Sequence, residues 1–221
     1  MVYAYAIAES LRAPPGGTGL DGTPLRVVAA DGLAAVVSDR DDAQLTVSED
    51  SLWAHERIVE RLMQEQAVLP MRFGSVLAGD DAVEAMLSER QAELSEGLRR
   101  VRGAVELGVR IAWDEDAVQR PEPDGASGPG TAYLMALSRA RRRAGELAER
   151  VDRSVAGLAR ARVQRRLASP SLPVSAAYLV DRANVEEFRA RIAELGSELS
   201  GVDLVCTGPW PPYSFAEGLR A

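Results

Sequence analysis

The side chains that most often carry catalytic chemistry are scarce in this sequence. It has one histidine, His55, and one cysteine, Cys206. His55 has the right chemistry for a general base, but the adjacent Glu56 would point to another side of a helix, and a packed, hydrogen-bonded histidine is the commoner case. Cys206 lies in an apolar run, where a buried and inert thiol is expected. We therefore predict no catalytic residue.

Cofactor and metal sites are not expected either. Residues 17–22 match the spacing G-x-G-x-x-G, which binds dinucleotides only where a strand leads in and a helix begins. Here Thr23, Pro24 and a strand-like run follow, so we predict a plain loop. One cysteine and one histidine rule out a disulfide framework, a cysteine zinc cluster and a multi-histidine metal centre. All 26 basic residues are Arg, which excludes Schiff-base and Walker-lysine chemistry.

Charge is distributed unevenly along the chain. Residues 131–168 contain ten Arg and three acidic residues, a local net charge of +7. Because the whole chain has a net charge of −7, the remaining residues together carry −14. Such asymmetry favours docking onto an acidic partner or nucleic acid. The alternative is a solvated face whose Arg stems pack on their neighbours. Because the chain as a whole is acidic, we expect no nucleic-acid partner.

Size and composition indicate an ordinary folded protein. The 221 residues are 46% hydrophobic and 27% charged, which suits one large or two small domains. No apolar run approaches the roughly 20 residues that span a bilayer, and the first residues lack the basic region of a signal peptide. We therefore expect a cytoplasmic location and no membrane contact.

Hydrophobic patterning predicts alternating strands and helices. Asp31 and Gly32 between two apolar runs are a strong hairpin signal, because a type I′ turn needs positive φ. A helix over 51–66 would turn Leu52, His55 and Val59 to one face. The predicted elements are strands 2–8, 25–30, 33–38, 67–76, 105–113, 172–180 and 202–207, and helices 51–66, 80–101, 131–168 and one opening at Asn184.

Two helix starts and one linker complete this prediction. Asp80 is expected to cap the second helix, and Asn184 with Glu187 resembles a capping box. Pro and Gly gather after residue 116, which marks a linker. We predict an α+β fold of two small domains, with mixed sheets and helices packed on one face of each. The expected parts are domains 1–115 and 131–208, the linker 116–130 and a Pro/aromatic tail 209–221.

Two irregular apolar segments are candidates for contact with a partner. One spans residues 68–74 and the other residues 210–215. A proline-aromatic tail usually folds back as a clamp over apolar surface, whereas exposed aromatic clusters mark interaction sites. Both interpretations stay open. The candidate partner-binding residues are Leu69, Pro70, Met71, Arg72, Phe73, Trp210, Pro212, Tyr213 and Phe215.

These strings also carry a family resemblance. Residues 54–60 (AHERIVE), 67–74 (AVLPMRFG) and 208–215 (GPWPPYSF) resemble the signature of the gas vesicle accessory family GvpL/GvpF. The opening strand Tyr3–Ile7 and the segment Ala177–Val180 are similar in style and place. The Gly/Pro-rich segment 14–24 departs from the family's pattern.

The resemblance implies a two-domain α+β protein whose second domain is ferredoxin-like. It implies no enzymatic activity and no catalytic residues. It implies a role in assembling gas vesicles, through binding to the hydrophobic shell protein and to other accessory vesicle proteins, with the vesicle as location. The alternatives from the residues themselves are an Arg-helix nucleic-acid-binding or regulatory protein, and an enzyme that uses His55.

Overall fold

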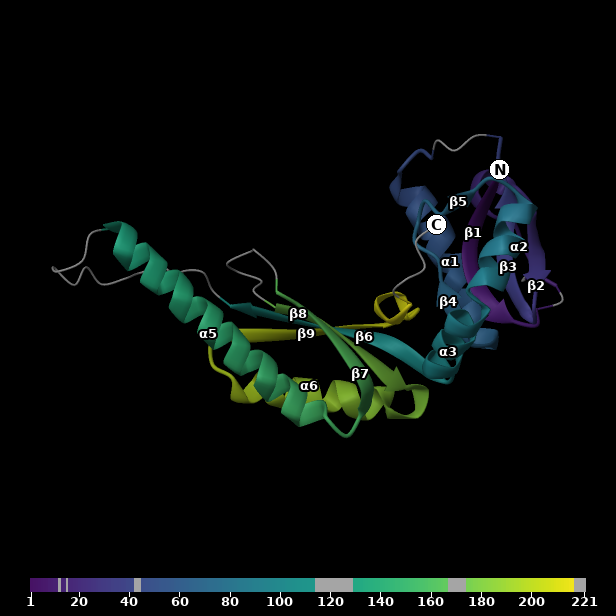
Figure 1. The fold of residues 1–221 in the computed structure, drawn as a ribbon. Coiled ribbons are helices and arrows are strands. Elements are labelled where there is room, and N and C mark those ends of the chain that lie inside the picture. Colours follow the sequence, from purple (N-terminus) through teal and green to yellow (C-terminus); the bar gives the residue numbers. More distant parts are fainter. Residues whose placement is uncertain (12, 15, 42–44, 114–128, 167–173, 217–221) are drawn as a thin grey trace. The chain divides into compact units, whose positions relative to one another are not determined.

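The computed structural model of the chain groups into two compact units (Figure 1). Unit 1 combines Met1–Val105 with the segment that begins at Trp210, and unit 2 is Glu106–Pro209. Unit 2 is thus inserted, in sequence, between two parts of unit 1. The structure describes residues 1–11, 13–14, 16–41, 45–113, 129–166 and 174–216.

This division differs from the expected boundaries. The expected linker 116–130 lies almost entirely outside the described residues. The strand before it, which we had assigned to the first domain, groups with unit 2 because it pairs with the strands of that unit. The C-terminal tail groups with unit 1 instead of standing apart.

Unit 1 is built on one sheet with two central strands. Its order is β2-β3-β1-β4, β5 also pairs with β1, and the pairings are antiparallel. Residues 2–8 and 33–38, on the two central strands, are buried throughout, so both faces of the sheet are covered. The strands are β1 (Val2–Glu9), β2 (Leu25–Ala30), β3 (Leu33–Asp39), β4 (Val68–Pro70) and β5 (Val76–Leu77).

The predicted hairpin is confirmed. Strands β2 and β3 pair from Leu25 with Ser38 to Ala30 with Leu33. The two turn residues, Asp31 and Gly32, have φ of 49° and 79°. Two consecutive positive φ values are those of the type I′ turn, which matches the twist of the flanking strands.

In the described part of unit 1, three α-helices pack around the sheet: α1 (Glu49–Glu65), α2 (Asp80–Glu89) and α3 (Gln91–Val101). The helix α1 packs against β1 and β4, and it begins with a capping box between Ser48 and Ser51. The single helix expected over 80–101 is two helices, because Arg90 leaves helical geometry. Asp80 is not the N-cap, which is Gly79; its carboxylate instead binds Arg26 of β2.

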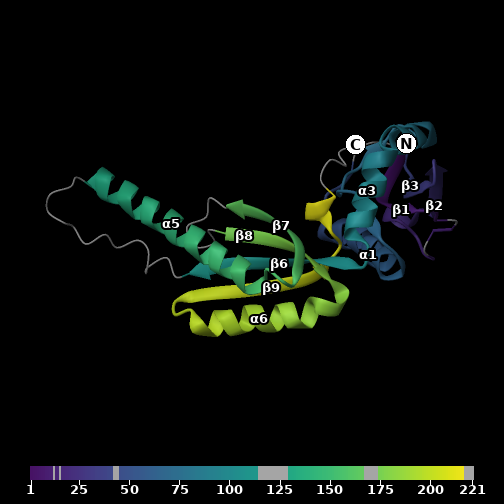
Figure 2. The ribbon, with the colours of Figure 1, turned by 60° about the horizontal axis from the view of Figure 1, so that its bottom comes forward.

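Unit 2 has the element order βαββαβ and the strand order β7-β8-β6-β9. This is the ferredoxin-like arrangement that the resemblance implied. Helices α5 and α6 pack against each other and cover one face of the sheet (Figures 1 and 2). The elements are β6 (Ala104–Trp113), α5 (Pro129–Val155), β7 (Ala159–Arg166), β8 (Val174–Asp181), α6 (Val185–Glu198) and β9 (Val202–Trp210).

Three expectations for unit 2 are wrong. The helix expected over 131–168 ends at Val155, and residues 159–166 form an edge strand on β8, with Gly157 in the turn between them. Asn184 makes no side-chain cap. The last strand runs on through Pro209 to Trp210, because an edge strand tolerates a residue without an N–H.

Candidate functional site

Unit 1 gathers five aromatic rings from distant parts of the chain, which we call the His55 cluster. Tyr3 and Tyr5 come from β1, His55 from α1, Phe73 follows β4, and Tyr213 lies in the short 3-10 helix η3 (Tyr213–Phe215). The His55 ring centroid lies 5.6 Å from both Tyr3 and Tyr5, 5.9 Å from Phe73 and 6.5 Å from Tyr213. The three strings that carry the family resemblance therefore meet at one place.

Both ring nitrogens of His55 are engaged. Nε2 lies 3.0 Å from the Met71 carbonyl oxygen, and because a carbonyl only accepts, Nε2 carries the proton and donates it. Nδ1 then accepts the hydrogen bond of the Tyr3 hydroxyl at 2.8 Å. The Tyr3 oxygen in turn accepts from the Gly74 N–H at 3.1 Å. This series of hydrogen bonds joins α1, β1 and the segment after β4.

Burial in the cluster favours the uncharged forms of His55, Tyr3 and Tyr5. His55 is 2% exposed, and burial lowers its pKa to about 4 despite the bond to Met71. Burial likewise raises the pKa of the Tyr3 and Tyr5 hydroxyls. The imidazole is therefore uncharged at neutral pH and has no free nitrogen with which to move a substrate proton. His55 occupies the place of a packed core histidine.

The C-terminal segment folds back onto this cluster. The Tyr213 hydroxyl donates to Glu56 Oε2 of α1 at 2.8 Å, and Arg100 of α3 donates to the Phe215 carbonyl at 2.7 Å. Pro211 and Pro212 are buried. One short segment thus holds two helices of unit 1, as a clamp would.

The nine candidate partner-binding residues divide by exposure. Leu69, for example, packs so closely on α3 that a Cβ added at Gly97 would lie 3.1 Å from Leu69 Cδ1. The buried members serve the fold and offer no surface to a partner in this conformation. The buried residues are Leu69, Pro70, Met71, Pro212 and Phe215; Phe73 and Tyr213 are partly exposed, and Arg72 and Trp210 are exposed.

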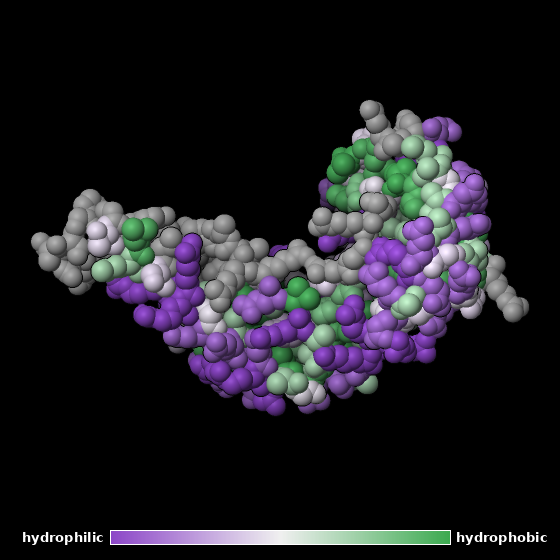
Figure 3. Space-filling view, in the orientation of Figure 1, coloured by the Kyte–Doolittle hydropathy of each residue, from purple (hydrophilic) through white to green (hydrophobic). Residues whose placement is uncertain are grey.

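The structure shows an exposed apolar surface at the start of α1 that the hydrophobic pattern of the sequence did not predict. Val47, Leu52 and Trp53, which we call the α1 patch, are 72%, 44% and 51% exposed. Leu52 had been expected on the buried face. Hydrophobic surface gathers over this part of unit 1 in Figure 3. Leu52 lies three and four residues before His55 and Glu56, so the patch borders the His55 cluster along the helix.

The glycine-rich loop at 17–22 is structural. Its only helical element is the short 3-10 turn η1 (Leu20–Gly22), so no helix N-terminus faces a phosphate. The Leu20 N–H donates to the Tyr5 hydroxyl at 2.7 Å. A Cβ at Gly19 would lie 2.3 Å from that hydroxyl, so residue 19 must be glycine for the loop to approach Tyr5. Residues 17–22 therefore form a loop that packs against Tyr5, a role that the sequence did not predict.

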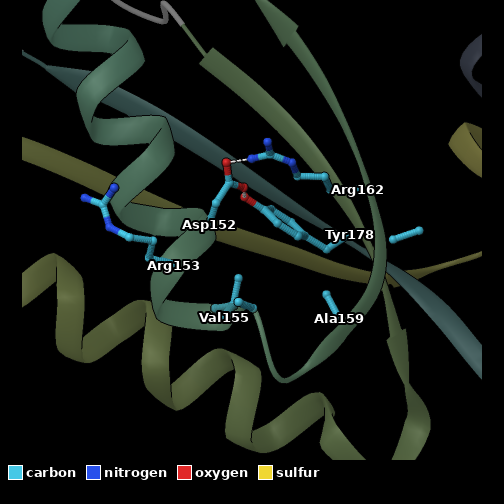
Figure 4. A pocket seen from close by; sticks show the side chains of 8 residues that line it. Asp152, Arg153, Val155, Ala159, Arg162 and Tyr178 are labelled. Carbon is cyan, nitrogen blue, oxygen red and sulfur yellow. Dashed lines mark hydrogen bonds and ion pairs between the residues drawn. The ribbon is translucent and has the colours of Figure 1, made fainter.

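Unit 2 contains a shallow pocket of about 320 Å³ between the end of α5 and strands β7 and β8 (Figure 4). Tyr178 donates to Asp152 Oδ1 at 2.7 Å, and Arg162 pairs with the other oxygen of the same carboxylate. Burial raises the pKa of Tyr178 to about 12. Tyr178, Asp152 and Arg162 are thus committed to one another, and Arg153, which also lines the pocket, pairs with Glu149 of α5.

Cys206 on β9 is only partly buried, and desolvation raises its pKa, which disfavours the thiolate. Within the described residues, no three His, Cys, Asp or Glu side chains gather as a metal site would require. In the same part of the chain, no helix is both long and apolar enough to cross a bilayer.

Comparison with known proteins assigns the chain to a family. The family model described as "Gas vesicle synthesis protein GvpL/GvpF" matches residues 1–217. Gas vesicle protein F of Streptomyces sp. (strain CB03234) is 34% identical, covering 97% of this chain and 99% of its own length. Gas vesicle protein L of the same strain is 30% identical, covering 97% and 92%.

Solved structures show the same fold. The crystal structure of GvpF from Anabaena sp. PCC7120 superposes with a TM-score of 0.83 at 21% identity, covering 98% of this chain and 95% of that one. GvpF from Microcystis aeruginosa gives a TM-score of 0.81 at 20% identity, covering 98% of both chains. The family match over residues 1–217 includes all three strings that converge on His55. This chain therefore belongs to the GvpL/GvpF family of gas vesicle synthesis proteins and takes part in gas vesicle formation.

Proposed function

We propose that this protein acts in gas vesicle formation by binding the hydrophobic shell protein, together with other accessory vesicle proteins, in the cytoplasm and at the vesicle. The proposed role needs contact surface and no chemistry. The shell protein is taken to be apolar enough that its free subunits aggregate unless they are shielded.

The observation that carries this proposal is the α1 patch. Three large apolar side chains, Val47, Leu52 and Trp53, stand at least 44% exposed within seven residues of chain. Exposed apolar groups that cluster in this way mark interaction sites, and Trp is enriched among residues that dominate binding energy. The capping box at Ser48 holds the start of the helix, so the patch is presented on a formed element.

The exposed members of the original candidates border this surface in our proposal. Phe73 and Tyr213 belong to the His55 cluster, and both side chains are partly exposed. Arg72 is exposed beside Phe73. We propose that these residues extend the contact, whereas the buried members support it from within unit 1.

The test is co-purification with a tagged shell protein. The double variant L52S/W53S removes apolar area without touching the core, so it should fold like the wild type and lose most shell capture. The matched control is V205S, which removes an equally exposed apolar side chain (47%) from β9 of unit 2. Capture that survives L52S/W53S unchanged would reject the patch, and absence of capture by the wild type at any salt concentration would reject shell binding.

A further inference from the structure

In the first half of α5, the side chains whose burial the structure describes are all at least partly exposed. Buried side chains on this helix begin at Ala144 and continue with Leu147, Ala148, Val151 and Val155. Among residues 129–143, none of those whose burial the structure describes is buried. At 1.5 Å per residue this segment is about 22 Å long, and it extends past the packed part of unit 2 (Figure 1). We call residues 129–143 the α5 arm.

The α5 arm is amphipathic in an unusual way. Leu134 and Met135 are 64% and 52% exposed near its beginning. Arg139 follows Met135 by one turn, and Arg141 follows Leu134 by two, so the two guanidinium groups lie on the same side as the apolar pair. The arm has four Arg and no acidic residue. Large apolar side chains that lie exposed next to each other mark interaction sites, which favours a partner that covers the apolar pair.

The α1 patch has the complementary pattern. Two exposed acidic residues, Glu49 and Asp50, precede Leu52 and Trp53 by one turn. Helix α1 has five acidic residues and two Arg, a net charge of −3, against +4 on the arm. The apolar pair thus lies C-terminal to the charges on α1 and N-terminal to them on the arm.

This reversal sets a packing direction. If the two helices run antiparallel with their apolar pairs in contact, Arg139 comes beside Glu49 and Asp50. The offsets agree, because three to four residues separate acid from apolar pair on α1 and four separate Met135 from Arg139. At 1.5 Å per residue the offset is about 4.5–6 Å on α1 and about 6 Å on the arm.

We propose that the α5 arm of one copy of this protein docks antiparallel on the α1 patch of a second copy. Donor and acceptor surfaces differ, so the contact is head-to-tail. It uses the arm of one copy and the α1 patch of the other, and it leaves one free arm and one free patch on the pair. Repetition of this contact builds short linear oligomers. If the proposed function holds, the shell protein competes with the arm for the α1 patch.

The experiment is sedimentation velocity on the nuclease-treated full chain over a range of protein and salt concentrations. The mean mass should rise with protein concentration and fall with salt, because exposed charges contribute to the contact. An arm variant, L134S/M135S, and the patch variant L52S/W53S should each stay monomeric. Their equimolar mixture should form a one-to-one dimer and nothing larger, since each variant keeps one intact surface.

Charge reversal tests the same contact independently. R139E/R141E and E49R/D50R should each abolish association, and the chain that carries all four changes should regain it. V205S should associate as the wild type does. A wild type that is monomeric throughout, or a mixture that stays monomeric, overturns the proposal. So does an arm that binds duplex DNA in a gel shift while no self-association is seen.

Shell capture separates this inference from the proposed function. The arm variant should still capture the shell protein, and the patch variant should not. Self-association without shell capture would leave the head-to-tail contact standing and reject shell binding. Shell capture without self-association would do the opposite.

Discussion

Unit 1 and unit 2 each place a tyrosine hydroxyl in a polar network, but in different surroundings. In unit 1, Tyr3 and His55 are 0% and 2% exposed, and they bond to each other, to the Gly74 N–H and to the Met71 carbonyl, all of them neutral groups. In unit 2, Tyr178 bonds to a carboxylate whose other partner, Arg162, has a side chain that is 50% exposed. The first network is dry and neutral, whereas the second is charged and reaches solvent.

The difference teaches which network each unit depends on. A buried polar group left without its partner costs the full desolvation of that group, whereas a solvent-reaching ion pair is replaced by water at little cost. We therefore expect unit 1 to be sensitive to its network and unit 2 to be tolerant. Substitutions at His55, Tyr213 and Arg162, and a change of pH, test that contrast.

Replacing His55 by Ala should lower the free energy of unfolding of unit 1 by about 3–5 kcal/mol, because it leaves a cavity and strips partners from Tyr3 and Met71. Urea unfolding followed by circular dichroism measures this loss. Trp53→Ala on the same helix is the control and should change stability by less than about 0.5 kcal/mol, as an exposed site. A loss below about 1 kcal/mol for His55→Ala would show that the cluster is not the core of unit 1.

Acid should destabilise unit 1 through His55. The folded pKa is about 4 and the unfolded value about 6.5, so the unfolded chain takes up the proton first. The stabilisation is complete above about pH 6.5 and is lost as the pH falls towards 4, about 3 kcal/mol in all. The difference between wild type and H55Q across this window isolates the effect from that of carboxylates. Parallel pH profiles for the two proteins would contradict the assignment of a neutral, buried imidazole.

Tyr213→Phe should lower stability by about 1–2 kcal/mol, because it removes the bond to the Glu56 carboxylate and keeps the ring. Amide hydrogen exchange in α1 should rise with it. Because the bond is partly buried, added salt should change this loss little. If exchange in α1 is unaffected, the tail does not clamp that helix.

Arg162→Gln in unit 2 should lower stability by at most about 1 kcal/mol at low salt, and by less as salt is added. Thermal unfolding at two ionic strengths checks this. A loss as large as that of His55→Ala, insensitive to salt, would mean that the network of unit 2 is as dry as that of unit 1.

Local patterns predicted part of the fold. The Asp31–Gly32 turn defined the hairpin, because only a few residue types accept two positive φ values. The helix predicted to open at Asn184 is α6, and its buried residues Val185, Phe188, Ile192 and Leu195 have the spacing of one helix face. The three strings that resemble the GvpL/GvpF family led to the family to which the chain belongs.

Other elements could not be read from local pattern. Residues 159–166 (ARARVQRR) suit a charged helix face or an alternating edge strand, and pairing with β8 decides for the strand. Leu52 keeps helical spacing with His55 yet is exposed, because spacing sets the face of a helix and not where neighbouring elements cover that face; the buried residues of α1 begin at His55. The α1 patch was missed for this reason.

The hairpin turn, most buried faces and the family follow from the amino-acid order alone, because these depend on neighbours within a few residues or on long shared strings. Tertiary structure decided which apolar residues are free. Leu69 and Leu52 are equally hydrophobic, but one is 2% exposed and the other 44%. Around His55, the structure brings together β1, α1, β4 and the C-terminal segment, whose residues lie up to 210 positions apart in the sequence. This packing decides which side chains hold unit 1 together and which remain available to a partner.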